Sequence, residues 1–434
     1  MRTTTSPRFA LGVLLAVNLL NFFDRQLPGA LGEPIRREFG LSDTALGFLG
    51  TVFTLFYAAV GLPAGRLSDR WVRTRLIAIG VALWSVTTAA SGLARTYAAL
   101  FASRLGVGLG EATCAPASQS LIGDLVPPQK RGRALGVFML GLPLGLFMAY
   151  MVSGYLGPLL GWRTVFLLAC LPGLVTALLA LMIAEPARGA ADHAGVAAGP
   201  HPAPYRAVLT IPTMIWIILS GALHNFNVYA VNAFQTPFLQ RFHQLSLKEA
   251  NLVSAVVLGL VGVIGLLGGG WAGDRLRQRR ANGRMLLAGG TAFLAAPCVL
   301  MALAQPKGAL LPFMLLMGAG STMMFVYYAT VYASIQDVIE PRLRGTAVAL
   351  YFFAQYVLGA SLGPMATGML SDTFARRAMA AAGAGAMAEP FRAAGLHQAM
   401  YVIPVLALLA GLALFAGART IAADIQRRQA AASL

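Results

Sequence analysis

The sequence reads Gly65-Arg-Leu-Ser-Asp69-Arg70-Trp-Val-Arg73 and, 205 residues later, Gly270-Trp-Ala-Gly-Asp274-Arg275-Leu-Arg277. Both stretches share the pattern Gly-x-x-x-Asp-Arg, and each directly follows a long apolar run. A pattern that recurs at a fixed offset indicates that a structural unit has been duplicated.

A second motif repeats in the same order. Asp124-Leu-Val-Pro-Pro128-Gln-Lys-Arg131-Gly132-Arg-Ala134 returns as Asp337-Val-Ile-Glu-Pro341-Arg-Leu-Arg344-Gly345-Thr-Ala347, at an offset of 213 residues. Two motifs that repeat in one order are hard to obtain by chance. The chain is therefore predicted to consist of two homologous halves of parallel topology.

The composition around these motifs is that of a membrane protein. Of 434 residues, 57% are hydrophobic and only 11% are charged, whereas soluble domains carry about 25% charged residues. This excludes an ordinary water-solvated protein and a disordered one. Runs of roughly 20 apolar residues predict membrane spans. The twelve predicted spans are 9–31, 44–65, 75–94, 98–122, 134–158, 163–184, 212–238, 247–271, 284–304, 309–336, 345–370 and 398–417.

These spans define the fold class, an all-α membrane protein with twelve transmembrane helices in two pseudo-symmetric halves of six. The predicted halves are 1–184 and 212–434, joined by a polar linker at 185–211 that is rich in Ala, Gly and Pro. The stretch 376–396 is too polar for a thirteenth span.

The basic residues predict the orientation of the chain in the membrane. The formal net charge of +17 would elsewhere suggest nucleic acid, but here Lys and Arg cluster between the apolar runs. The side that holds both termini carries 21 basic residues, the opposite loops carry 10, and two lie within spans. Positively charged loops stay in the cytoplasm. We therefore expect a multi-pass protein of the cell (inner) membrane with both termini cytoplasmic and no nucleic-acid partner.

The three cysteines, Cys114, Cys170 and Cys298, fall inside apolar runs, with no CxxC and no His/Cys cluster nearby. This pattern supports neither a disulfide framework nor a metal site. We expect no cofactor other than protons as a coupling ion.

Six plus six spans with Gly-x-x-x-Asp-Arg after spans two and eight resemble the major facilitator superfamily. A narrower resemblance is carried by Asn21-Phe-Phe-Asp24-Arg25, by Arg104-Leu-Gly-Val-Gly108-Leu-Gly110-Glu111, by Ile122-Gly-Asp124-Leu and by Gly161-Trp-Arg163. Together these motifs resemble the Spinster family, and the short termini resemble a bacterial member. The resemblance implies a transporter that works by alternating access. Eukaryotic members of this family export sphingosine-1-phosphate or lysophospholipids.

Four ionisable residues lie well inside predicted spans: Asp24 and Arg25 in the first, Arg104 and Glu111 in the fourth. Each would cost at least roughly 2.5–3.5 kcal/mol at the bilayer centre, so they should face the interior and pair. Arg104 and Glu111 share a helix face, while Asp24 and Arg25 point about 100° apart, so only one of them need face Arg104. We interpret the set as a proton-coupling site rather than a static salt bridge. The resemblance implies Asp24 and Glu111 as proton carriers and Arg104 as their partner or as a headgroup anchor.

The repeated motifs predict a cytoplasmic gate, in which glycine permits close helix approach and aspartate accepts hydrogen bonds from a neighbouring helix end. The same charges also serve as topology signals. The predicted gate residues are Gly65, Asp69, Arg70, Arg73, Asp274, Arg275, Arg131 and Arg344.

Polar residues on other spans are candidates for a substrate cavity, although ordinary interhelical hydrogen bonding explains them equally well. The candidates are Arg104, Asn21, Asn225, Tyr229, Asn232, Tyr328, Tyr351 and Gln355. An apolar cavity with a few such groups suits an amphiphile.

The sequence therefore leaves three alternative functions. The first is a proton-coupled secondary transporter of a lysolipid-like or sphingolipid-like amphiphile, acting as a monomer in the lipid bilayer. The second keeps the fold but carries a small organic anion or drug. The third, an integral membrane enzyme, lacks support because only His224 of the five histidines lies in a span and no metal-ligand spacing occurs.

Overall fold

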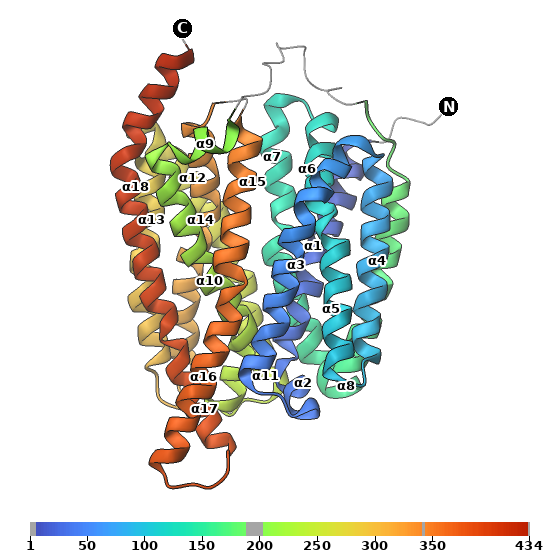
Figure 1. The fold of residues 1–434 in the computed structure, drawn as a ribbon, viewed down its shortest axis with the longest axis vertical. Coiled ribbons are helices and arrows are strands. Elements are labelled where there is room, and N and C mark those ends of the chain that lie inside the picture. Colours follow the sequence, from blue (N-terminus) through green and yellow to red (C-terminus); the bar gives the residue numbers. More distant parts are fainter. Residues whose placement is uncertain (1–5, 188–202, 341–342, 433–434) are drawn as a thin grey trace. The chain divides into compact units, whose positions relative to one another are not determined.

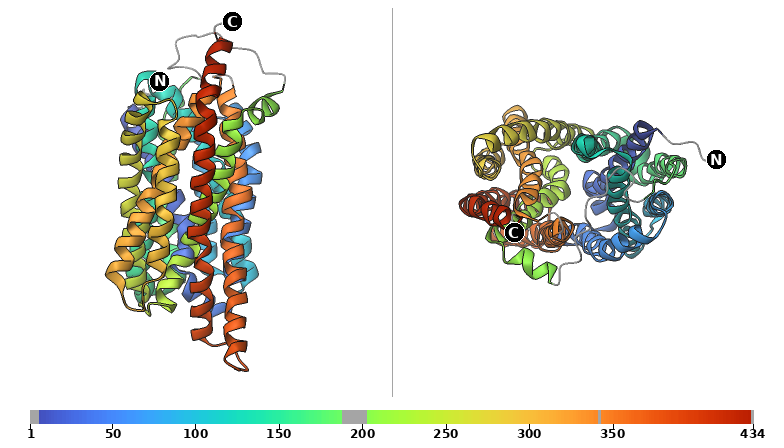
Figure 2. Two further views of the ribbon diagram at one scale, coloured as in Figure 1. Left: turned by 90° about the vertical axis from the view of Figure 1, so that its left-hand side faces the viewer. Right: turned by 90° about the horizontal axis from the view of Figure 1, so that it is seen from above.

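The computed structural model describes residues 6–187, 203–340 and 343–432. Within these ranges all the regular secondary structure is helical, and the long helices of each compact unit run side by side (Figures 1 and 2). This agrees with the predicted all-α class, since only a helix satisfies every backbone polar group of a span within its own segment.

The helices follow the predicted order. The first half of the sequence forms α1 (Pro7–Ala30), α2 (Gly32–Phe39), α3 (Asp43–Arg70), α4 (Arg73–Leu93), α5 (Tyr97–Ala112), α6 (Cys114–Leu125), α7 (Pro128–Met139) and α8 (Gly141–Leu181). The second half forms α9 (Pro204–Leu209), α10 (Pro212–Arg241), α11 (Leu247–Ser254), η1 (Ala255–Leu260), α12 (Val261–Arg279), α13 (Gly283–Leu303), α14 (Leu310–Val338), α15 (Arg344–Ala354), η3 (Gln355–Ala360), α16 (Leu362–Ala381), α17 (Glu389–Met400) and α18 (Val402–Ala432).

Ten helical stretches among the described residues are long and apolar enough to cross a membrane. One of them, Arg133–Leu181, contains two predicted spans, because the chain leaves helical geometry at Gly161 (φ 78°, ψ 157°). That backbone conformation is essentially reserved for glycine, so Gly161 separates span five from span six. α5 and α6 supply the remaining span, and the twelve predicted spans are thereby accounted for.

The structure corrects the prediction in three places. Span 98–122 is interrupted at Thr113, because the ring of Pro116 clashes with the carbonyl of the residue four positions earlier. The helices that carry the last predicted span, 398–417, are longer than the span itself, since α17 begins at Glu389 and α18 extends to Ala432. η1 and η3 are π-helical, a geometry for which the apolar pattern gives no signal.

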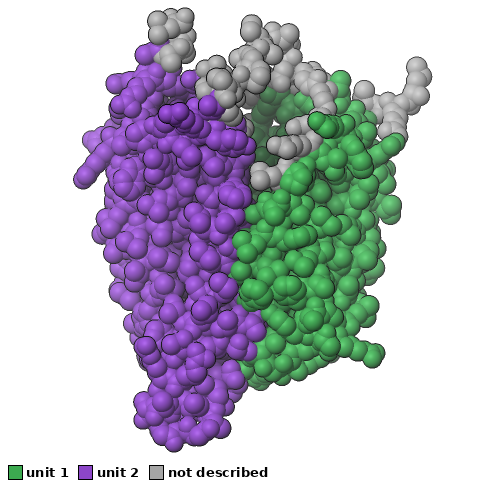
Figure 3. All heavy atoms as spheres, in the orientation of Figure 1, with its two compact units in different colours: residues 1–41, 48–196, 246–255 green, residues 42–47, 197–245, 256–434 purple. Residues whose placement is uncertain are grey.

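The chain divides into two compact units (Figure 3). Unit 1 contains residues 1–41, 48–196 and 246–255, and unit 2 contains 42–47, 197–245 and 256–434. Each unit therefore includes a short segment from the other half of the sequence.

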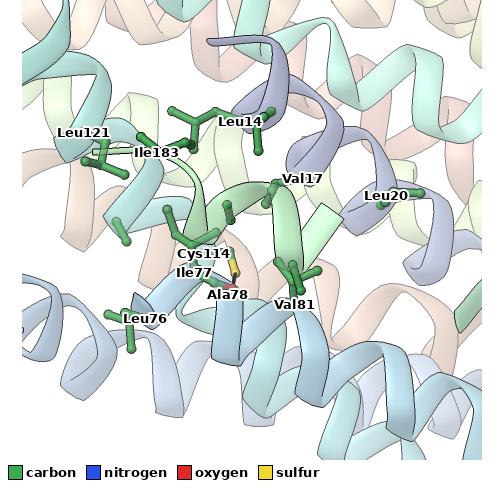
Figure 4. Close-up of a cluster of buried hydrophobic side chains, with 14 of the residues drawn as sticks. Leu14, Val17, Leu20, Leu76, Ile77, Ala78, Val81, Cys114, Leu121 and Ile183 are labelled. Atoms are coloured by element: carbon green, nitrogen blue, oxygen red, sulfur yellow. Dashed lines mark hydrogen bonds between the residues drawn. The ribbon is translucent and has the colours of Figure 1, made fainter. Parts of the chain in front are cut away.

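Each unit has its own hydrophobic core. In unit 1, Val17 from α1, Ile77 and Val81 from α4, and Cys114 from α6 gather with Ile183 (Figure 4). In unit 2 the corresponding core joins α10, α13, α14, α15 and α18. By contrast, many large apolar side chains on the outside of the helices are exposed, such as Leu159 at 77% and Leu178 at 66%. Such residues are stable in contact with lipid.

Candidate functional site

Three of the four predicted coupling residues are completely buried in unit 1. Asp24 on α1 is 1% exposed, and Arg104 and Glu111 on α5 are 2% and 0% exposed. Arg25 is nearly as buried, with a side chain that is 9% exposed. The structure thus brings together the four charges that the sequence placed within spans.

The ion pair within this group joins Arg25 to Glu111. The Arg25 Nη2 donates to Glu111 Oε2 at 2.8 Å and its Nε donates to the same oxygen at 3.2 Å. The Arg25 Nη2 also donates to Asn21 Oδ1 at 3.1 Å, one turn earlier on α1. Asn21, predicted as a cavity residue, therefore helps to hold the cation.

Aromatic rings complete the surroundings of Arg25. Its guanidinium carbon lies 4.6 Å from the ring centroid of Tyr57 and 5.2 Å from those of Phe22 and Phe53. Aromatic faces stabilise a desolvated cation. Arg25 is consequently held by one carboxylate, one amide and three rings.

Arg104 is arranged differently. Its Nη1 donates to the backbone carbonyl of Asp24 at 3.4 Å, and its guanidinium carbon lies 5.7 Å from the ring centroid of Phe166. Among the described residues, its Nε and Nη2 have no hydrogen-bond acceptor, and Asp24 Oδ1 and Glu111 Oε1 have no donor. Both carboxylates still interact electrostatically with Arg104. The site therefore combines one closed ion pair, Arg25 with Glu111, with a cation and an acid, Arg104 and Asp24, that each keep atoms without a hydrogen-bond partner among the described residues.

A second charged cluster lies where α4 begins. Arg73, a predicted gate residue, is fully buried, and it donates to Glu185 Oε1 at 2.7 Å, to Ser120 Oγ at 2.9 Å and to the carboxylate of Asp124. Glu185 in turn accepts from the backbone N–H of Thr74 at 3.0 Å, which caps the N-terminus of α4. Sequence reasoning missed Glu185 because it lies in the predicted linker.

Unit 2 repeats this arrangement at the start of α13. Arg284 Nη1 donates to Asp337 at 2.8 Å and its Nη2 donates to Asp274 at 2.6 Å, while Arg277 reaches Asp337 at 3.1 Å. Asp124 and Asp337 are the equivalent residues of the second repeated motif. The duplication seen in the sequence is thus also a duplication of contacts. In each unit an arginine at the start of a span binds the aspartate of the second repeated motif.

The other predicted gate residues contribute less. Arg70 is exposed, Arg131 Nε donates to the Val126 carbonyl at 3.1 Å, and Arg275 lies 5.9 Å from the ring centroid of Trp271. The side chains of Asp69 and Arg344 lie outside the described part of the structure.

Gly65 lies in an open position. Among the described residues, an added Cβ there would meet no atom within 4 Å, so its expected role in close helix approach stays a prediction. Close approach occurs at Gly265 and Gly269 of α12, where an added Cβ would lie 2.3 Å from the Thr322 carbonyl oxygen and 2.8 Å from Val326 Cα of α14.

The remaining predicted cavity residues all lie in unit 2. Asn225 Nδ2 donates to the Gln355 carbonyl at 3.5 Å, and the rings of Tyr229 and Tyr356 meet edge to face at 6.2 Å. Tyr351 donates to Tyr327 Oη at 3.0 Å. Tyr328 and Asn232 are half-buried. Asn225, Tyr229, Tyr328, Tyr351 and Gln355 therefore belong to one neighbourhood.

Sequence reasoning missed two members of this neighbourhood, Tyr327 and Tyr356. Tyr327 stacks on His224 with ring centroids 4.0 Å apart and shares a hydrogen bond of 3.1 Å with Ser220. Tyr332 and Tyr328, one turn apart on α14, give the helical spacing that could have pointed to this cluster.

Two units of long apolar helices, one of which buries a cluster of four charges on α1 and α5, are typical of a multi-pass membrane transport protein. Comparison with known proteins agrees, since the model of the Major Facilitator Superfamily matches residues 14–364. An MFS-type efflux pump of Mycolicibacterium smegmatis is 31% identical over 366 residues, which cover 84% of each chain. The chain therefore belongs to the major facilitator superfamily.

The chain is also similar to transporters of the Spinster type. The crystal structure of a bacterial homologue of the human lysosomal transporter Spinster, in an inward-facing and unoccupied conformation, superposes with a TM-score of 0.83 at 29% identity, over 97% of this chain and 99% of that one. The sphingosine-1-phosphate transporter of Danio rerio is 25% identical over 425 residues, 94% of this chain and 83% of that protein. Such proteins are transporters, so the alternative of a membrane enzyme is wrong.

Proposed function

We propose that the protein is a proton-coupled secondary transporter of an amphipathic solute, working by alternating access in the inner membrane with both termini in the cytoplasm. The observation that carries the proposal is the buried charge set of unit 1. Arg25 stabilises the ionised form of Glu111 at 2.8 Å, so a conformation in which this pair opens favours uptake of a proton by the buried acid. Asp24 has an oxygen atom available for a second proton site.

Coupling is tested by flux in proteoliposomes with radiolabelled sphingosine-1-phosphate under an imposed pH gradient. We expect the gradient to accelerate wild-type flux, and Asp24→Asn or Glu111→Gln to abolish that acceleration because the amide cannot carry the proton. Exchange without a gradient should persist. Glu389→Gln, a change at a side chain that is 52% exposed, is the matched control. Wild-type acceleration in both buried variants would contradict the proposal.

For the solute, the favoured class is a lysolipid or sphingoid phosphate. Arg104 supports this choice, because its Nε and Nη2 have no acceptor in the described structure and a guanidinium binds phosphate through two parallel hydrogen bonds. The Danio rerio relative is named for the transport of such a phosphate. The alternative, a small organic anion or drug, is supported by the relative named as an efflux pump.

Arg104→Lys separates charge from geometry. The ammonium keeps the positive charge but loses the planar fork, so we expect sphingosine-1-phosphate to bind at least tenfold more weakly in tryptophan-quenching titrations. Arg37→Lys, whose side chain is 64% exposed, should leave the affinity unchanged. Wild-type affinity in Arg104→Lys would exclude this arginine as the headgroup anchor.

A further inference from the structure

The middle of unit 2 contains a cluster of aromatic rings that we name the tyrosine cluster: Tyr229 on α10, Tyr328 and Tyr332 on α14, and Tyr356 on η3. Ring centroids lie 5.9 Å apart for Tyr328 and Tyr332 and 6.2 Å apart for Tyr229 and Tyr356. The ring of Phe352 lies between the two pairs, 5.7 Å from Tyr332 and 6.3 Å from Tyr356. All four side chains are half-buried. The rings thus surround a common region while keeping accessible surface.

Buried polar atoms without partners lie in the same neighbourhood. His224 is 3% exposed and meets Tyr328 edge to face at 5.1 Å. Gln355 is 2% exposed and directly precedes Tyr356. Among the described residues, neither His224 Nε2 nor Gln355 Oε1 has a hydrogen-bond partner. A buried polar atom that is left unpaired destabilises the protein, so these atoms indicate a place where a ligand supplies the missing partner.

The backbone around Gln355 is also unusual. η3 is a π-helix, closed by a hydrogen bond of 2.9 Å from Ser361 N–H to the Tyr356 carbonyl. Gly359 lets it pack directly on α10, since an added Cβ would lie 2.3 Å from the Ala222 carbonyl oxygen. π-helical turns are rare and occur frequently at functional sites. Here the turn brings Gln355 and Tyr356 to α10.

The charge of this region narrows the chemistry of the ligand. No Asp, Glu, Lys or Arg occurs in 212–240, 310–336 or 346–371, the stretches that carry the cluster. An anionic group would find no cation there and would face the negative surfaces of the rings. A cation, in contrast, is stabilised by those ring faces. The Oε1 of Gln355 and the phenol oxygens can accept its N–H groups.

We propose that the tyrosine cluster, together with Gln355 and His224, binds the ammonium group of an amphipathic amine. The inference rests on the proposed transport of an amphiphile and specifies one part of it, a protonated amino group recognised by rings and neutral acceptors rather than by a carboxylate. The region of unit 1 around Arg104 has the opposite preference. The transported class would then be an amine-bearing amphiphile.

The test compares two probes of equal chain length, decylammonium and 1-decanol. Their binding to the full-length protein is measured in phosphatidylcholine nanodiscs at pH 7 without a gradient, with empty nanodiscs as the reference. We expect decylammonium to bind at least tenfold more tightly than decanol. Because no proton gradient is present, the result does not depend on whether Asp24 and Glu111 couple transport to protons.

Variants of the cluster test the ring and the acceptor separately. Tyr328→Phe should keep the preference for the amine, whereas Tyr328→Leu should reduce it to threefold or less. Gln355→Glu should tighten decylammonium binding about tenfold, and Gln355→Leu should weaken it. Tyr205→Leu, at a residue that is 59% exposed, is the control. Equal affinity for the two probes, no binding of either, or weaker amine binding in Gln355→Glu with an unchanged elution profile would overturn the proposal.

Discussion

Replacing Arg25 by methionine should lower the free energy of unfolding by about 3–5 kcal/mol, the usual cost of removing one partner from a buried ion pair. Glu111 is fully buried and accepts two hydrogen bonds from Arg25. The change would leave this carboxylate without its cation. Denaturant titration in detergent, followed by tryptophan fluorescence, measures the loss.

The double variant Arg25→Met/Glu111→Gln separates this explanation from simple loss of packing. Removing both charges eliminates the uncompensated carboxylate, so the double variant should be clearly more stable than Arg25→Met alone. Additive losses from the two single changes would contradict the assignment of the stability to the pair. They would indicate that contacts with Tyr57, Phe22 and Phe53 hold Arg25.

The second large effect is expected at Arg241 in unit 2. Arg241 Nη1 donates to Asp43 Oδ2 at 2.8 Å, with side-chain exposures of only 1% and 2%. Ser371 donates to the same carboxylate oxygen at 2.6 Å. Arg241→Met should therefore also cost about 3–5 kcal/mol, because Asp43 remains buried without its cation.

An exposed arginine of the same unit provides the control. Arg427 pairs with Asp424 at 3.3 Å, but its side chain is 73% exposed. Exposed pairs contribute about 0–1 kcal/mol, so Arg427→Met should lower the free energy of unfolding by less than 1 kcal/mol. Equal losses in the free energy of unfolding of the two variants would show that burial does not make the Asp43–Arg241 pair more stabilising than an exposed pair.

The spans were predictable because a lipid-embedded helix has to be apolar over about 20 residues. Even the break between spans five and six follows from Gly161. The charge cluster was also predictable as a group, since ionisable residues are rare at that depth. The repeated motifs anticipated that Asp124 and Asp337 have equivalent partners.

Partner choice could not be predicted. Arg25 and Glu111 are 86 residues apart, and whether Asp24 or Arg25 faces a given residue of α5 depends on the rotation of two helices. Asp43 and Arg241, 198 residues apart, are charges next to span ends and carry no pattern that distinguishes them from topology signals. The π-helix at Gln355 packs on α10 through Gly359, and the apolar pattern of the sequence carries no signal for it.

The exchange of short segments between the two units has a consequence for biosynthesis. The contiguous part of unit 1 ends at residue 196, but residues 246–255 complete it, with Asn251 donating to the Ala30 carbonyl at 3.1 Å and packing on Gly154. At about 5–20 residues per second, the ribosome needs roughly 3–12 s to extend the chain from 196 to 255. During this interval the surface of α8 that receives α11 has to be covered by lipid or by the insertion machinery. Unit 2 in turn awaits a segment, 42–47, that was synthesised long before it, so the two units mature together rather than one after the other.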